Sequence, residues 1–164
     1  MGQDSRQTLR AAILGAETAL RSGAGLVTVA TDPANMSSLL ARVPEAMGVD
    51  ALGDNAEHTI ASVMAAASVV VLGPGLGRGA WARQVIGALA SYDGPLVIDA
   101  DGLYWLADTP QAKTLKNRGA PLFLTPHAGE AARLLECSTG EILSNPRKAV
   151  IDMTERFNAT CLLK

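Results

Sequence analysis

Residues 121–135 read PLFLTPHAGEAARLL and contain the change from strand to helix that decides the fold. The apolar run at residues 122–124 stops at Thr125 and Pro126, and from Gly129 onward the apolar residues recur with helical spacing. A buried strand followed at once by a helix is the repeating unit of α/β proteins. The stretch therefore predicts a strand that ends before Thr125 and a helix that begins at Gly129.

The same alternation extends along the rest of the chain. The predicted strands are Leu26–Thr31, Ser68–Leu72, Pro95–Asp99, Pro121–Leu124 and Thr160–Lys164. The predicted helices are Thr8–Arg21, Asp32–Ala41, Ala56–Ala66, Trp81–Ser91, Gly102–Ala107, Gly129–Glu136 and Asn145–Phe157. Because the strands are continuously apolar, we expect an α/β fold with a mostly parallel central sheet and helices on both faces.

No linker or internal repeat divides the chain, so residues 1–164 are predicted to be a single domain. The last predicted strand stops at Lys164 without a crossover helix. We therefore expect a partial domain, with a sheet that is incomplete at its C-terminal end. Such a sheet leaves an unpaired hydrophobic edge, which favours association.

The composition excludes several classes of protein. Hydrophobic residues make up 48% of the chain and charged residues 18%, which allows a sizeable core. The net charge of −2 gives no reason to expect a nucleic-acid or membrane-surface partner, and the apolar runs are too short to span a bilayer. Cys137 and Cys161 form no metal-binding spacing, and a reducing cytoplasm is the default location.

Ligands of open parallel sheets bind outside the carboxyl ends of the strands. The first such end is GPGLG, residues 73–77. Its glycines let the backbone approach a bulky ligand, so Gly75 and Gly77 are candidate substrate contacts. The alternative is an ordinary tight turn.

The second strand end is DADGL, residues 99–103. Asp99 and Asp101 could hold a hydrated Mg²⁺ or orient a polar substrate. The alternative is that Asp101 caps the following helix and that Asp99 is simply solvated at the rim of the sheet.

The third strand end is TPHAGE, residues 125–130. His127 can both donate and accept a hydrogen bond, and Glu130 lies in the first helical turn, where a carboxylate is favoured. The alternatives are a solvated loop histidine and a helix-capping glutamate. The other histidine, His58, lies on a predicted surface helix and is interpreted as structural.

The order of these motifs resembles one known family. ALRSGAGLVTVAT, RVPEAM, VVVLGPGLG, PLVIDADGL, LTPHAGEAARLL and CLLK follow one another as in the ADP- or ATP-dependent NAD(P)H-hydrate dehydratases. That family, also met as the carboxyl-terminal domain of bifunctional NAD(P)H-hydrate repair enzymes, has a ribokinase-like fold. The resemblance extends over nearly the whole chain, although the family's domain is longer.

The resemblance implies a metabolite-repair lyase. The family uses ADP or ATP with Mg²⁺ to phosphorylate the ring hydroxyl of the S-epimer of NAD(P)H hydrate. Loss of phosphate then restores NAD(P)H, with AMP as the other product when ADP is the donor. Because this is phosphoryl transfer followed by elimination, the protein must chiefly position groups and neutralise charge.

The resemblance also assigns roles to residues. It marks Ala11, Gly77 and His127 as substrate-binding residues, and the strand-end motifs add Gly75 and Asp101 as predicted substrate-binding residues. Lys164 matches the first residue of the family's nucleotide-binding KGAGT segment, and Glu130 and Asp99 are the predicted metal residues. No catalytic residue is predicted within residues 1–164, since the family's catalytic Asp is expected beyond Lys164.

The chain also departs from the family pattern. Arg10 replaces a glycine next to the predicted substrate contact Ala11, and Tyr104 replaces a common asparagine. The remainder of KGAGT and the downstream GMGD segment, which carries the catalytic Asp, are absent. We therefore expect that a polypeptide ending at Lys164 cannot complete the reaction.

Two other functions remain open at this point. One is a ribokinase-like vitamin or small-alcohol kinase, which more often has Asn where His127 stands. The other is a catalytically inactive domain that binds a nucleotide or only assembles with other subunits. Members of the resembled family are generally homo-oligomers, so a homo-oligomer is expected by resemblance.

Overall fold

The computed structural model describes residues 3–52, 55–89, 92–109, 115 and 117–164, and side chains only from residue 9 onward. These residues fall into two compact units, described separately below. The first comprises residues 1–66 and 74–88, and the second comprises residues 67–73 and 89–164. That residues 1–164 form one domain stays a prediction.

The first unit contains a parallel pair of strands with four helices. Its elements are α1 (Gln3–Arg21), β1 (Thr28–Thr31), α2 (Pro33–Arg42), β2 (Met47–Asp50), α3 (Ala56–Ala66) and α4 (Ala80–Ala88). Thr28 of β1 lies opposite Met47 of β2. Ala16, Val43 and Ala46 are buried together in its core.

The start of α2 follows from the sequence. Asp32 is the N-cap residue, and its carboxylate accepts a hydrogen bond of 2.8 Å from the backbone N–H of Ala34. Pro33 occupies the first turn, where its missing N–H costs nothing. Strand β2 was not predicted, because Gly48 and Asp50 leave only two apolar residues in its MGVD sequence.

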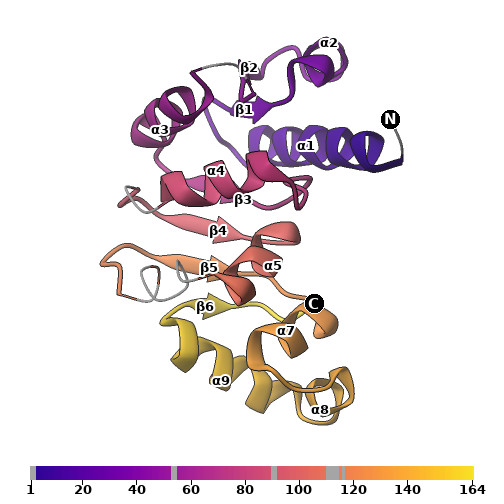
Figure 1. The fold of residues 1–164 in the computed structure, drawn as a ribbon, viewed down its shortest axis with the longest axis vertical. Helices are drawn as coiled ribbons and strands as arrows, with labels where there is room; N and C mark the ends of the chain where they lie inside the picture. Colours follow the sequence, from indigo (N-terminus) through magenta and orange to yellow (C-terminus); the bar gives the residue numbers. More distant parts are fainter. Residues whose placement is uncertain (1–2, 53–54, 90–91, 110–114, 116) are drawn as a thin grey trace. The chain divides into compact units, whose positions relative to one another are not determined.

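The second unit is a four-stranded parallel sheet in the order β3-β4-β5-β6. The strands are β3 (Val70–Leu72), β4 (Leu96–Ile98), β5 (Leu122–Leu124) and β6 (Thr160–Cys161). The helices are α5 (Asp101–Asp108), α7 (Ala128–Leu135), α8 (Thr139–Ser144) and α9 (Pro146–Phe157). The arrows of β4, β5 and β6 point the same way in Figure 1. The predicted β–α repeats are therefore confirmed.

Burial alternates along these strands. Ile98 pairs with Leu72 on one side and with Leu124 on the other, and all three side chains are buried. The opposite face carries Val71 and Phe123, whose exposed fractions are 61% and 41%. One face of the sheet thus forms the core of the unit, while the other leaves apolar side chains exposed.

Two details of this unit differ from the prediction. The N-cap of α5 is Ala100, so Asp101 does not cap this helix but is its first residue. Helix α8 was not predicted, although Ser138 and Glu141 form a complete capping box at its start. A six-residue helix of sequence TGEILS is too short to show apolar periodicity.

Candidate functional site

Four strand ends meet at one edge of the four-stranded sheet. Because the strands are parallel, Gly73, Asp99, Thr125 and Cys161 each lie at or just beyond the carboxyl end of a strand on that edge. Beyond β6 the chain stays beside β5: the N–H of Lys164 donates a hydrogen bond of 2.9 Å to the carbonyl of Pro126. Lys164 therefore lies next to the residue that precedes His127.

The first glycine of GPGLG is required by a close approach of two backbones. Gly73 has a φ of 125°, and a Cβ built on it would lie 1.7 Å from the carbonyl oxygen of Asp99. The N–H of Asp99 in turn donates to the carbonyl of Leu72 at 3.0 Å. Gly73 thus allows the ends of β3 and β4 to pack directly against each other.

The DADGL turn contains a strained residue that the sequence did not reveal. Ala100 has φ 48° and ψ −122°, a backbone conformation that residues other than glycine rarely adopt. The carbonyl of Asp99 accepts a hydrogen bond of 2.9 Å from the N–H of Gly102, which closes the turn. Strain of this kind costs about 1–3 kcal/mol and is concentrated at functional sites. It marks the segment between Asp99 and Asp101 as part of the candidate site.

His127 and Glu130 form a capping box at the start of α7. Nδ1 of His127 accepts hydrogen bonds from the N–H groups of Gly129 at 3.0 Å and Glu130 at 3.3 Å. Oε2 of Glu130 accepts the N–H of His127 at 2.8 Å. The expectation that Glu130 caps the helix is confirmed, and His127 is an N-cap residue rather than a solvated loop residue.

The His127 ring combines this structural role with an open edge. Its side chain is 60% exposed, whereas that of Glu130 is 18% exposed. Its second ring nitrogen, Nε2, lies 3.4 Å from Oε1 of Glu130. His127 can therefore contact a ligand at the sheet edge without leaving the cap.

Asp99 and Lys164 form an ion pair at the same edge. The ammonium Nζ of Lys164 lies 2.6 Å from Oδ1 of Asp99, and the two side chains are 43% and 29% exposed. A lysine at this position can neutralise a phosphate group by exchanging one anionic partner for another. The structure thus joins a cation and a carboxylate that are 65 positions apart, at the same edge of the sheet as the His127 cap.

The donor groups at this edge do not form a direct metal site. Among the residues that the structure describes, no group of three or more His, Cys, Asp or Glu side chains is arranged to hold a metal ion. Asp99 is paired with Lys164, and both carboxylate oxygens of Glu130 face His127. That Asp99 and Glu130 help to hold a Mg²⁺ ion stays a prediction.

The remaining predicted residues lie in the first unit. Ala11 is half-buried on α1, and Gly75 and Gly77 have φ values of 74° and 71° in the turn before α4. The indole N–H of Trp81 donates a hydrogen bond of 3.0 Å to the carbonyl of Leu76 and holds this turn. That these residues share a ligand with His127 stays a prediction.

Sequence reasoning missed a set of side chains that joins α5 to α7. The guanidinium of Arg133 lies 4.2 Å from the centre of the Tyr104 ring, and it forms an ion pair of 3.2 Å with Asp108. These contacts hold together the two helices that begin at Asp101 and at the His127 cap. The only signal in the sequence was Tyr104 itself, which departs from the resembled pattern.

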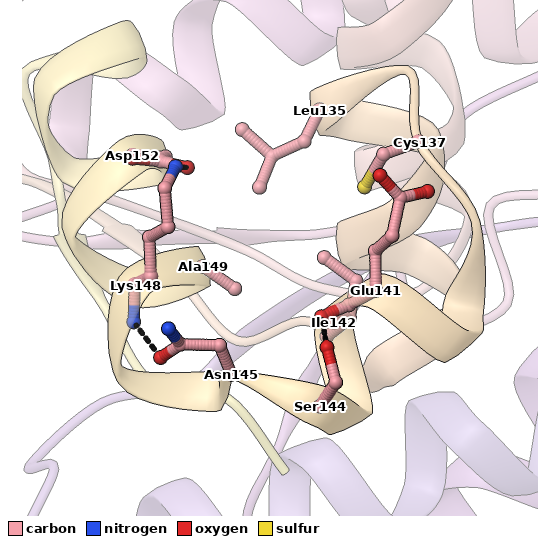
Figure 2. Close-up of a pocket in the computed structure, with 9 residues that line it drawn as sticks. All are labelled: Leu135, Cys137, Glu141, Ile142, Ser144, Asn145, Lys148, Ala149 and Asp152. Atoms are coloured by element: carbon pink, nitrogen blue, oxygen red, sulfur yellow. Dashed lines mark hydrogen bonds and ion pairs between the residues drawn. The ribbon is translucent and has the colours of Figure 1, made fainter.

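A groove lies among α7, α8 and α9 (Figure 2). It has a volume of about 350 Å³, with Leu135, Ile142 and Ala149 among its apolar lining residues. Glu141 and Lys148 contribute charge to its lining, and the nearby Asp152 carboxylate raises the pKa of Lys148. None of the predicted site residues lines this groove.

In the part of the chain that the structure describes, no helix has both the length and the apolar character needed to cross a membrane.

The arrangement of strands and strand-end residues defines a ribokinase-like α/β protein. A solved structure with this fold is a ribokinase-like superfamily protein of Enterococcus faecalis V583, which matches with a TM-score of 0.78 and 30% identity. The match covers 97% of this chain and 54% of that one. The family model for NAD(P)H-hydrate dehydratase matches residues 5–164. The chain therefore belongs to the NAD(P)H-hydrate dehydratase family.

Two curated relatives agree with this assignment. The bifunctional NAD(P)H-hydrate repair enzyme Nnr of Coxiella burnetii is 38% identical over 151 residues, which are 92% of this chain and 29% of that protein. The ADP-dependent (S)-NAD(P)H-hydrate dehydratase of Lactiplantibacillus plantarum is 45% identical over 127 residues, which are 76% of this chain and 43% of that protein. The chain thus spans less than half the length of either relative. The names of these two relatives do not support the alternative of a vitamin or small-alcohol kinase.

Proposed function

We propose that this chain serves the ADP- or ATP-dependent dehydration of the S-epimer of NAD(P)H hydrate. The reaction restores NAD(P)H and, with ADP as the phosphate donor, releases AMP and phosphate. The observation that carries the proposal is the match of the dehydratase family model to residues 5–164. The ion pair and the histidine cap that meet at one sheet edge support it.

We assign contacts with the substrate and the nucleotide to the predicted site residues. His127 contacts the damaged nicotinamide ring, and Asp101, Ala11, Gly75 and Gly77 are the further substrate contacts. Lys164 binds the phosphates of the nucleotide by exchanging Asp99 for a phosphate oxygen. Asp99 and Glu130 provide negative charge for a Mg²⁺ ion that is bound through water.

The protein's own contribution is positioning. Phosphoryl transfer requires the ring hydroxyl and the phosphate to be held in line, with the charge of the phosphate neutralised. The capping box fixes the His127 ring relative to α7, and the ammonium of Lys164 already lies beside a carboxylate that it can release. These contacts support a positioning role for both residues.

Calorimetry of the protein with (S)-NADPH hydrate, and separately with ADP, tests the proposal. Unmodified NADPH and the R-epimer are the matched controls, since they differ from the substrate only at the ring. We expect the S-epimer to bind at least about tenfold more tightly than the R-epimer, as one well-placed hydrogen bond allows. Equal affinity for all three pyridine nucleotides would disprove the proposed substrate.

We further propose a cytoplasmic location and a homo-oligomeric state. The composition and the two free cysteines support the first, and the exposed Val71 and Phe123 on one sheet face support the second. Sedimentation over a range of concentrations tests the second proposal. A monomer at all concentrations would contradict it.

A further inference from the structure

The hydrogen bonds of the capping box determine where His127 carries its proton. In a neutral imidazole one ring nitrogen accepts a hydrogen bond and the other donates one. Nδ1 of His127 accepts from two backbone N–H groups, those of Gly129 and Glu130. A proton on Nδ1 would face both of these donors, so the ring proton belongs on Nε2.

We infer that His127 meets its ligand as a hydrogen-bond donor through Nε2–H, while Nδ1 is reserved for capping α7. The inference rests on the proposed function and states what this histidine does there. The ligand group that it recognises is an acceptor oxygen, such as the ring hydroxyl or the carboxamide carbonyl of the hydrated nicotinamide. His127 is not the base that removes the proton of the hydroxyl, since its free lone pair is already used.

Glu130 is the positioning residue for this donor. Its Oε2 holds the backbone N–H of His127 at 2.8 Å, and its Oε1 lies 3.4 Å from Nε2. The carboxylate therefore favours the Nε2–H form and keeps the donor at the exposed edge of the ring. A ligand oxygen can accept the Nε2–H hydrogen bond either in place of Oε1 of Glu130 or together with it.

Two substitutions separate the two roles of the ring. In His127→Asn, the side-chain oxygen lies where Nδ1 lies and is an excellent helix cap, but the distal donor is gone. In His127→Gln, the longer amide reaches the position of Nε2 but loses the acceptor of the cap. The two variants are therefore matched controls for each other.

We expect opposite effects from these variants. His127→Asn keeps the unfolding midpoint of the wild type and binds (S)-NADPH hydrate about tenfold more weakly, the effect of one lost hydrogen bond. His127→Gln lowers the unfolding midpoint, because its amide no longer supplies the acceptor that caps α7. Wild-type affinity in His127→Asn, or weaker binding only in His127→Gln, would overturn the inference.

Nuclear magnetic resonance of the ring nitrogens gives a test that requires no variant of His127 and no ligand. The protein is labelled with ¹⁵N-histidine and measured at a pH at which imidazoles are neutral. His58, exposed on α3, is the internal control, and His58→Gln assigns the signals. We expect His127 to show an acceptor Nδ1 and a protonated Nε2, while His58 shows the averaged pattern of a solvated ring. A protonated Nδ1, or the same averaged pattern for both histidines, would refute the inference.

The ring pattern also separates this inference from the proposed function. If the wild-type protein shows the expected Nε2–H pattern but does not bind the hydrate, the proposed function fails while the assignment of the proton holds. If it binds the hydrate but shows the averaged pattern, the inference fails while the proposed function stands.

Discussion

Gly73 and Asp99 approach each other so closely that a Cβ on Gly73 would lie 1.7 Å from the carbonyl oxygen of Asp99. This contact fixes the spacing between the ends of β3 and β4, and Asp99 carries the carboxylate that holds Lys164. Gly73, the first glycine of the GPGLG motif, is therefore required by packing.

Gly73→Ala should destabilise the protein strongly. The substitution adds a clash with backbone atoms to the cost of a φ of 125°, and the two together amount to at least ~3 kcal/mol. Gly77→Ala is the matched control, since its φ of 71° is also positive but a Cβ there meets no atom within 4 Å. We expect it to cost only about 1–2 kcal/mol. Urea unfolding measures both, and equal losses would contradict the packing argument.

Removing the Glu130 carboxylate should loosen the start of α7. Glu130→Ala leaves the N–H of His127 without its 2.8 Å acceptor, and loss of a capping interaction costs about 0.5–2 kcal/mol. Glu130→Gln retains an acceptor oxygen and should lose less than half of that. Glu155→Ala, on the exposed side of α9, is the control for a general change of charge. If Glu130→Gln and Glu130→Ala destabilise equally, the charge rather than the cap is responsible.

Lys164 should matter for nucleotide binding far more than for folding. Its ion pair with Asp99 is partly exposed, and such pairs contribute at most ~1 kcal/mol to stability. We expect Lys164→Gln to change the unfolding free energy by less than that and to weaken ADP binding by at least about tenfold. Calorimetry and urea unfolding of the same sample test this directly. If Lys164→Gln greatly lowered the unfolding free energy but left the ADP affinity unchanged, Lys164 would be a structural residue rather than a nucleotide-binding one.

Cys161 should resist alkylation in the folded protein. Burial raises the pKa of this thiol, which favours the neutral form over the reactive thiolate. The contribution of this protonated thiol to the free energy of unfolding is fully present below the ordinary thiol pKa. It is lost as the pH rises through the raised pKa that Cys161 has in the folded protein. In a Cys137→Ser background, the folded chain should therefore react with iodoacetamide more slowly than the unfolded chain, and reach its full rate at a higher pH. Equal rates at every pH would show that the thiol is not protected.

The part of the fold that the sequence predicts is the β–α repeat. Ile98 and Leu124 belong to short, continuously apolar runs, and these runs are typical of parallel strands with a buried face. The placement of Asp99 and Lys164 at one edge follows from the parallel order alone. Strand β2 was missed because a four-residue strand that contains Gly48 gives almost no apolar signal.

The geometry of the candidate site could not be predicted from the sequence. The strained backbone of Ala100 could not be predicted, because alanine ordinarily avoids positive φ. The cap formed by His127 was missed because Ser, Thr, Asp and Asn are the expected N-cap residues. The ion pair between Asp99 and Lys164 joins residues 65 positions apart, a separation at which sequence spacing gives no contact information.

The central claim is that His127 contacts the damaged nicotinamide ring. The most direct measurement follows the Nε2 resonance of His127 while (S)-NADPH hydrate is titrated into the labelled wild-type protein. We predict a saturable shift of this resonance, with His58 unchanged and with a weaker response to the R-epimer. A His127 signal that stays still while the hydrate binds elsewhere, or that moves equally for both epimers, would contradict the account.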